Sequence, residues 1–156
     1  MDNILKYLEN TAEKFPDKTA VDDGNQQFTY QELLNRARHF GLSFLNRTEP
    51  GRPVAILHEK SSEILSAMFG VVYAGCFYVP VNPMNPAERL RKIMEKLEPE
   101  VIISDEKGKE QLAAVGVGLE EKVIGPEILL PTTGTDLSEE QRSRLEQIQG
   151  QWKETD

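Results

Sequence analysis

The apolar positions of the first fifty residues follow two periods, which predict two helices and a pair of strands. Residues 3–14 carry apolar side chains at helical spacing, so a short amphipathic helix is expected there. The segment TAVDDGNQQFTY predicts two short strands that turn around Asp23-Gly24-Asn25. Thr29 and Glu32 have the spacing of a capping box, which predicts the start of a second helix. The expected apolar stripes are Ile4, Leu8 and Ala12 in the first helix, and Leu34, Ala37, Gly41 and Leu45 in the second.

Beyond residue 50, short apolar runs alternate with helical patterns. The expected elements are a buried strand at 54–57, a helix at 62–74, a buried strand in CFYVPV, a helix from about 85, a buried strand at 101–104, a helix at 107–115 and a short strand at 122–124. The helix at 62–74 is apolar most of the way round, so we expect it to be deeply buried. This alternation predicts an α/β fold with a mostly parallel sheet and helices on both of its faces.

The stretch YAGCFYVPVNPMNPAERL carries three prolines within seven residues and marks the passage from a strand to a helix. Gly75 is expected to end the preceding helix in a left-handed conformation. Asn85 is expected to be the N-cap of the next helix, with Pro86 at its first position and Glu88 at its third. That helix would bury Leu90, Ile93, Met94 and Leu97, a stripe worth roughly 6–10 kcal/mol before conformational entropy is subtracted.

Two parts of the chain are expected to differ in character. Residues 1–130 form the α/β subdomain, and residues 131–156 form a loop followed by a polar helix. Ser138 and Gln141 predict the start of that helix. Its apolar stripe is limited to Leu145, Ile148 and Trp152, so we expect it to dock weakly or to need a partner surface.

Composition narrows the classes of function. The 156 residues have a formal net charge of −8, which argues against a nucleic-acid or anionic-membrane surface. The uncharged stretch between Ile64 and Ala87 has the length of a membrane span, but Gly75 and Pro80 interrupt it, and a helix followed by a strand explains it better. A single cysteine, Cys76, and the lack of a signal peptide predict a cytoplasmic location.

Few side chains suggest chemistry, and each has an ordinary explanation. Cys76 lies in an apolar run, which favours a packed thiol over a nucleophile. His39 and His58 are expected at the ends of different elements, without partners for a zinc site. His58 ends a strand, where ligand-facing groups often lie, but a surface histidine is favoured. Ser61 or Ser62 is expected to cap a helix, because EKSSE lacks the glycine-flanked elbow of a nucleophilic serine.

Three further motifs are also weak. TTGT at residues 132–135 has one glycine and no following lysine, which argues against a Walker-type phosphate loop. Gly70 and Gly75 are too far apart for a dinucleotide fingerprint. The carboxylate pairs Asp22-Asp23 and Glu139-Glu140 are more typical of solvated surfaces than of acid–base pairs. From its residues alone, the chain predicts no catalytic, cofactor-binding or metal-binding side chain.

Taken together, several stretches resemble the N-terminal region of the adenylate-forming superfamily, which includes acyl-CoA synthetases, D-alanine–carrier ligases and the adenylation domains of nonribosomal peptide synthetases. FTYQELLNRA, residues 28–37, is similar to an aromatic-Thr-Tyr-x-Glu-Leu segment of that family. VAILHEKSSEILSAMFGVVYAGCFYVPVNPMNPAERL, residues 54–90, resembles its strand, buried helix, Tyr-Val-Pro element and following helix start. VIISD resembles the next strand, and the likeness is good over residues 1–105.

Two positions depart from the family pattern. Tyr73 stands where many members have lysine, and Asn82 stands where amino-acid-activating members usually have aspartate. Asn82 is also common among acyl-CoA synthetases, so the acid that is activated stays open. The resemblance gives the matched residues structural roles: Gly75 in the turn, Pro80 and Pro83 at the strand exit, and Arg89 in the following helix.

The resemblance implies that the intact protein uses ATP and Mg²⁺ to activate a small carboxylic acid, either an amino acid or an acyl acid, as an acyl-adenylate. It also implies transfer of the acyl group to the thiol of CoA or of a carrier protein's phosphopantetheine. In relatives, the phosphate-handling loop, the acid pocket and a C-terminal lysine lie downstream, and QWKETD resembles the residues that lead to that loop. We therefore expect the fragment itself to bind no cofactor and to be inactive.

The alternative is a non-catalytic, stand-alone α/β module that binds a partner protein through its LEQIQGQW helix. The genomic reading frame after Asp156 separates the two hypotheses, since only the ligase predicts a following Ser/Thr/Gly-rich loop with a lysine. We also expect exposed strand edges to promote a homodimer or a larger species.

Overall fold

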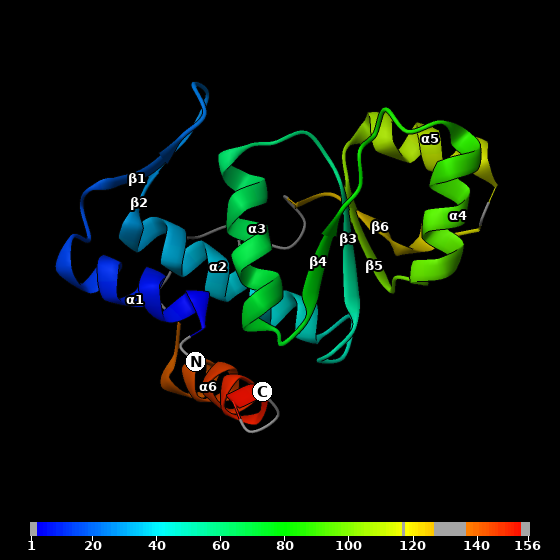
Figure 1. The fold of residues 1–156 in the computed structure, drawn as a ribbon. Coiled ribbons are helices and arrows are strands. Elements are labelled where there is room, and N and C mark those ends of the chain that lie inside the picture. Colours follow the sequence, from blue (N-terminus) through cyan, green and yellow to red (C-terminus); the bar gives the residue numbers. More distant parts are fainter. Residues whose placement is uncertain (1–2, 117, 127–136, 154–156) are drawn as a thin grey trace.

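The computed structural model of the chain describes residues 3–116, 118–126 and 137–153, except for the side chains of 151–153. A helix and an antiparallel strand pair are followed by alternating helices and parallel strands (Figure 1). The elements are α1 (Ile4–Lys14), β1 (Thr19–Asp22), β2 (Gln27–Thr29), α2 (Tyr30–Leu45), β3 (Pro53–Leu57), α3 (Ser62–Tyr73), β4 (Phe77–Pro80), α4 (Ala87–Leu97), β5 (Val101–Ser104), α5 (Glu106–Val115), the 3₁₀ turn η1 (Glu120–Lys122), β6 (Val123–Ile124) and α6 (Glu139–Lys153).

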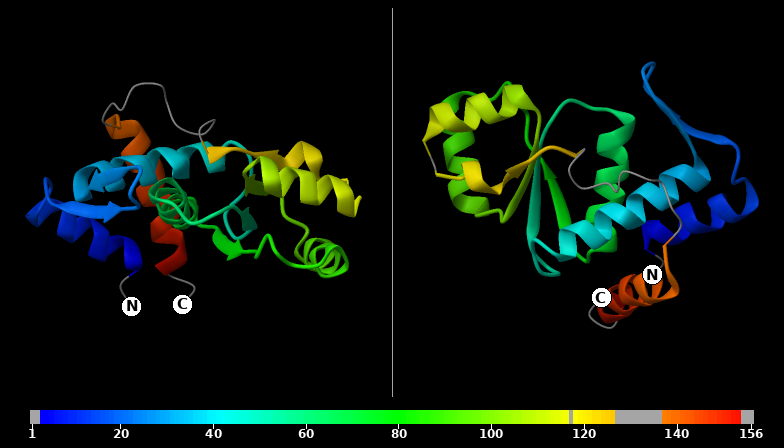
Figure 2. Two further views of the ribbon diagram at one scale, coloured as in Figure 1. Left: turned by 90° about the horizontal axis from the view of Figure 1, so that it is seen from above. Right: turned by 180° about the vertical axis from the view of Figure 1, so that it is seen from behind.

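The main sheet is parallel and has the strand order β4-β3-β5-β6. Helices α2 and α3 lie on one face, and α4 and α5 lie on the other (Figures 1 and 2). This arrangement confirms the predicted α/β class with helices on both faces, preceded by a short helix and a hairpin. Within the described residues, every helix is too short or too polar to cross a lipid bilayer.

Strands β3 and β5 form the centre of the core, and every residue in both is buried. Their side chains alternate between the two faces of the sheet, as the strand period of two requires. One set packs against α2 and α3: Val54, Ile56, Val101 and Ile103. The other set packs against α4 and α5: Ala55, Leu57 and Ile102. The prediction of two strands covered on both faces is confirmed.

A third group of buried side chains joins α1, the β1–β2 hairpin and α6 to the outer side of α2. Its members include Leu5, Leu8 and Ala12 of α1, Phe28 of β2, Leu33 and Leu34 of α2, and Leu145 of α6. These elements form an additional layer beyond the three-layer core of α2 and α3, the sheet, and α4 and α5 (Figure 2).

Two capping boxes fix the starts of α2 and α6 where the sequence places them. The Glu32 backbone N–H donates to Thr29 Oγ1 (3.2 Å), and the Thr29 N–H donates to Glu32 Oε1 (3.2 Å). The same reciprocal pair links Ser138 and Gln141 at 3.2 and 3.0 Å. Each pair satisfies two of the donors that a helix N-terminus otherwise leaves unpaired.

Gly75 ends α3 as predicted, with a φ of 74°. The Cys76 N–H donates to the carbonyl oxygen of Val71 (3.1 Å), and the Gly75 N–H donates to that of Val72 (3.0 Å). These two bonds define a Schellman motif, which needs a residue that adopts a positive φ without strain. The turn aims the chain directly into β4.

Two local predictions are wrong by one position. Leu5, not Ile4, joins Leu8 and Ala12 on the buried side of α1, and Ile4 is 51% exposed. At α4 the helix begins at Ala87, so Pro86 occupies the N-cap with extended backbone, and no described side chain caps the helix. Pro86 cannot donate a backbone hydrogen bond, which makes it tolerable on either side of that boundary.

The prediction that CFYVPV forms a buried strand is also wrong. Among the described strands, β4 pairs only with β3 and is an edge strand, with Phe77 51% and Tyr78 37% exposed. The backbone N–H groups of Phe77 and Val81 donate to carbonyl oxygens on the β3 side. Because successive backbone amides of a strand point to opposite edges, the backbone nitrogens of Tyr78 and Pro80 point to the free edge. Because Pro80 has no N–H, this edge offers few donors to another strand.

Helix α3 is buried on two sides only, by α2 and by the sheet. On its third side Leu65, Met68 and Phe69 are only partly buried, so the predicted deep burial all round is wrong here. Exposed side chains of α1 and β4 continue this surface. We call the whole surface the apolar strip: Ile4, Tyr7, Leu65, Met68, Phe69 and Tyr78.

Helices α2 and α3 approach each other so closely that a glycine is required in the contact. A Cβ on Gly70 would overlap the Cβ of Phe40 and would lie 2.9 Å from the carbonyl oxygen of Ala37. A Cβ on Gly41 would lie 2.7 Å from that of Tyr73. The two glycines therefore set the distance at which α3 lies on α2.

Replacing Gly70 with alanine should lower the free energy of unfolding by roughly 1–3 kcal/mol, because the helices must separate. Gly150→Ala is the matched control, since Gly150 also lies in a helix and an added Cβ would meet no described atom within 4 Å. That change should raise the stability by up to about 1 kcal/mol through helix propensity alone. Urea unfolding followed by circular dichroism measures both changes, and equal effects of the two substitutions would contradict the role of the close contact.

Candidate functional site

The largest hollow at the carboxyl edge of the sheet lies between the ends of β3 and β4 and the first turns of α3. It has a volume of about 700 Å³. Its apolar wall consists of Ile56, Ile64, Leu65, Met68, Pro80, Val81 and Pro83. Ligands of open α/β sheets commonly bind at this edge, so we take the hollow as the candidate site.

Three polar side chains of the hollow, those of His58, Ser61 and Asn82, bond to backbone groups close to them in the chain. The imidazole Nδ1–H of His58 donates to the carbonyl oxygen of Glu59 (2.8 Å). Ser61 Oγ accepts the Ile64 N–H (3.1 Å) and caps α3, which confirms the capping prediction. Asn82 Oδ1 accepts the Met84 N–H (2.9 Å) in the turn after β4. These bonds describe a shaped apolar hollow, not a nucleophile with its base.

The hollow does not fit a nucleoside triphosphate with Mg²⁺. Phosphate groups need several converging N–H donors or cations, and Mg²⁺ needs oxygen ligands around it. The walls here are mostly apolar, and Lys60 is the single cation among the residues that line the hollow. Among the residues that the structure describes, no three His, Cys, Asp or Glu side chains lie close enough to share a metal ion.

The Asp22-Asp23 pair shapes the hairpin and connects it to α3. Asp22 Oδ1 accepts the Gly24 N–H (2.9 Å). Asp23 Oδ1 accepts the N–H groups of Asn25 (2.8 Å) and Gln26 (2.7 Å), and its Oδ2 accepts the Ser62 N–H (2.8 Å). These hydrogen bonds, first among them the one from Ser62, lower the pKa of Asp23 to about 2. Asp23 is therefore a second cap of α3, supplied by a hairpin 39 residues earlier in the chain.

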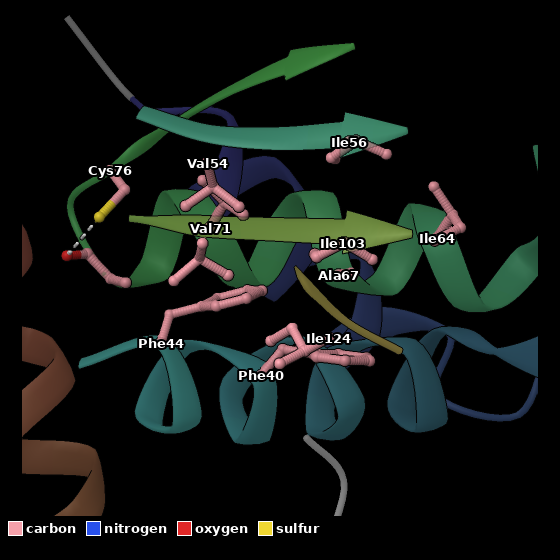
Figure 3. Close-up of a cluster of buried hydrophobic side chains, with 12 residues drawn as sticks. Phe40, Phe44, Val54, Ile56, Ile64, Ala67, Val71, Cys76, Ile103 and Ile124 are labelled. Carbon is pink, nitrogen blue, oxygen red and sulfur yellow. Dashed lines mark hydrogen bonds between the residues drawn. The ribbon is translucent and has the colours of Figure 1, made fainter. Parts of the chain in front are cut away.

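Cys76 is packed inside the sheet–helix core, as the sequence predicts. The residue is 8% exposed, and its Sγ lies 3.3 Å from the carbonyl oxygen of Glu49 and 3.8 Å from that of Ala74. Figure 3 shows Cys76 among the buried side chains of this core. Burial raises the pKa of the thiol, which keeps it in its unreactive protonated form.

The remaining candidates do not meet at one place. His39 lies inside α2 and not at the end of an element, which corrects its predicted position. Glu139 and Glu140 are exposed in the first turn of α6, where carboxylates favour the helix dipole. Residues 132–135 lie outside the described residues.

The side chains at the two positions that depart from the adenylate-forming pattern both take part in hydrogen bonds. Tyr73 is 2% exposed, and its hydroxyl donates to Glu9 (2.6 Å), so burial and then this bond raise the pKa of the hydroxyl. Arg38 pairs with the same carboxylate (3.7 Å). Asn82 uses only its side-chain oxygen, an acceptor that aspartate shares.

The comparison with known sequences decides the family. Residues 8–154 match the family described as AMP-binding enzyme. The chain belongs to this family.

The chain spans only a small part of the length of the curated relatives that it matches. Bacitracin synthase 1 of Bacillus licheniformis is 34% identical over 127 residues, which are 78% of this chain and 2% of that protein. Bacitracin synthase 2 of the same organism is 33% identical over 112 residues, which are 70% of this chain and 4% of that protein. The structure of VinN in complex with 3-methylaspartate superposes with a TM-score of 0.74 at 20% identity, covering 96% of this chain and 38% of that one. The chain corresponds to the N-terminal portion of the adenylate-forming fold.

The hollow and the cap from Asp23 were not found from the sequence. The hollow combines residues of β3, α3 and β4 that become neighbours only through parallel pairing. The one available signal was the position of His58 and Asn82, each just after a strand in the same sheet.

The bond from Asp23 to Ser62 predicts a specific pH dependence of stability. Because the folded pKa is lowered from 3.8 to about 2, the contribution is present above pH 3.8 and is lost as the pH falls toward about 2. Asp23→Asn cannot present a second oxygen to Ser62, so its urea midpoint should lie below that of the wild type at pH 6. The two midpoints should converge near pH 2.

Asp17→Asn, a change of the same type in an exposed turn, serves as the control for the loss of one charge. A constant difference between Asp23→Asn and the wild type at every pH would contradict the carboxylate's role as a cap.

The packing of Cys76 predicts a protected thiol. Modification by a water-soluble disulfide reagent should be at least about 100-fold slower in the native chain than in urea, because the thiol reacts only after local opening. A chain with Cys76→Ala and Ala113→Cys moves the thiol to an exposed position on α5 and should react rapidly while folded. Equal native rates in the two proteins would show that the pocket around Cys76 is open.

Proposed function

We propose that the chain is the N-terminal part of an ATP-dependent ligase that activates a carboxylic acid, an amino acid or an acyl acid, as an acyl-adenylate. The intact enzyme then transfers the acyl group to the thiol of CoA or of a carrier protein. The match of residues 8–154 to the AMP-binding enzymes carries this proposal. The nonribosomal peptide synthetases among its relatives support a carrier protein as the acceptor, although the choice of acid stays open.

The 156-residue chain itself is inactive in this proposal. Adenylate formation needs positioned cations and N–H groups around the transferred phosphorus. The described residues supply a scaffold in which the family-like segments form β2–α2 and β3–α3–β4–α4. The Gly75 turn, Pro80 and Pro83 direct the backbone, and Lys60 is the single cation among the residues that line the hollow.

The apolar strip supports a longer polypeptide. Ile4 and Tyr7 are 51% and 67% exposed, and they adjoin the partly buried Leu65 and Phe69 of α3. Surfaces of this kind mark an interface with another part of a protein or with a partner. We propose that downstream segments of the same ligase cover the strip, since the chain matches only 38% of the VinN chain.

The homodimer and the cytoplasmic location stay predictions. Pro80 weakens pairing through the free edge of β4, so a dimer of the isolated chain would rest on the apolar strip. The interaction-module alternative has less support than the ligase, because Leu145, an apolar residue of the proposed partner-binding helix, is already buried against its own chain.

Acid-dependent exchange of pyrophosphate into ATP tests the proposal. The 156-residue chain should show no exchange above background with any member of a panel of amino acids and acyl acids. The polypeptide encoded by the uninterrupted reading frame should show exchange with at least one of them. Exchange by the short chain would contradict its predicted inactivity, and a stop codon after Asp156 would contradict the ligase.

A further inference from the structure

Among the described side chains of the polar helix α6, Leu145 is buried and Gln149 makes hydrogen bonds to other elements. Leu145 is 2% exposed and packs beside Gly41 and Tyr73. Gln149 is partly buried at the C-terminal end of α3. The side chains of residues 139–144, 146 and 147 are exposed. Ile148 is partly buried. A helix this polar gains little from burial, so the contacts of Leu145 and Gln149 are important for its position.

The side-chain amide of Gln149 links α6 to the C-terminal end of α3 and to the N-terminal end of α1. Its Nε2 donates to the carbonyl oxygens of Val72 (2.7 Å) and Tyr73 (3.1 Å) in the last turn of α3. Its Oε1 accepts the Nδ2–H of Asn3 (2.7 Å), and Asn3 itself caps α1 by accepting the Leu5 N–H (3.0 Å). Figure 2 shows the start of α1 beside α6 in both views.

The chemistry of this joint requires an amide of glutamine length. The two Nε2 hydrogens go to carbonyl oxygens in the last turn of α3, where the regular backbone bonds of the helix end. The Val72 oxygen also accepts the Gly75 N–H, and it has a second lone pair for Gln149. A carboxylate at this position has no hydrogen to donate, and its charge would face the negative end of the α3 dipole. A lysine could donate to the carbonyls but could not accept from Asn3.

We propose that Gln149 is a positioning residue. It holds α6 against the C-terminal end of α3, next to the Gly75 turn, and thereby fixes the place from which the polypeptide after α6 continues. This inference rests on the proposed function and on the resemblance of QWKETD to the residues that lead to the phosphate-handling loop of the family. The joint couples that segment to the turn that sets the direction of β4. Loosening it would affect ATP placement more than the binding of the acid.

The first experiment uses the 156-residue chain and compares Gln149→Glu with Gln147→Glu. Both substitutions make the same change of charge on the same helix, and Gln147 is exposed. Hydrogen exchange of α6 should accelerate at least about tenfold in Gln149→Glu, because the helix opens without global unfolding. Exchange in β3 and β5 should stay at the wild-type rate in both variants. The fluorescence anisotropy of Trp152, the only tryptophan, gives a second readout.

Leu145→Ala provides a reference for a released helix, since it removes the other contact. Equal α6 exchange rates in Gln149→Glu, Gln147→Glu and the wild type would contradict the claim that the Gln149 hydrogen bonds hold α6 in place.

The second experiment uses the full-length gene product and separates the joint from the enzyme assignment. Gln149→Glu should raise the KM for ATP by about threefold or more and leave the KM for the acid unchanged, whereas Gln147→Glu should change neither. Release of α6 without any change in the KM for ATP would overturn the positioning role. A wild-type full-length protein without ATP–pyrophosphate exchange activity would overturn the proposed function and the positioning role. The hydrogen-exchange experiment would still test whether Gln149 holds α6 in place.

Discussion

The contact of α2 with α3 is the constraint on which the rest of the structure depends. Gly70 and Gly41 let the two helix backbones approach to a distance that any larger side chain would prevent. That approach places one side of α3 on α2 and a second side on β3 and β5. The third side of α3 forms part of the apolar strip. The remaining sites described above lie at the two ends of α3. The hollow and the Asp23 cap are at its N-terminal end, and the Gly75 turn and Gln149 are at its C-terminal end.

The contribution of these residues to function is geometric. In the chain, the segments that most resemble the family define a strand, a packed helix, a sharp turn and a strand exit. The polar side chains near the hollow, His58, Ser61 and Asn82, each satisfy a backbone group. A scaffold of this kind limits where the segments that follow it can start. In the proposed function, phosphate chemistry belongs to residues outside it.

Local signals could be predicted from the sequence because neighbouring residues determine them. The Thr29 box, the Gly75 turn and the start of α6 at Ser138 each depend on a few consecutive positions. The edge position of β4 could not be predicted, because apolar runs of central and edge strands look alike until the strand order is known. The same holds for the bare side of α3, the long-range bond from Asp23 to Ser62 and the residues of the hollow, which depend on packing between distant segments.

The most direct test of the account is hydroxyl-radical footprinting of the 156-residue chain and of the full-length gene product. Met68 and Tyr78 of the apolar strip should react in the short chain and become protected in the longer one, while Met94, which is 1% exposed, should be unreactive in both. Equal reactivity of Met68 and Tyr78 in the two proteins would mean that nothing downstream covers α3. That result would contradict the account of this chain as one layer of a larger ligase.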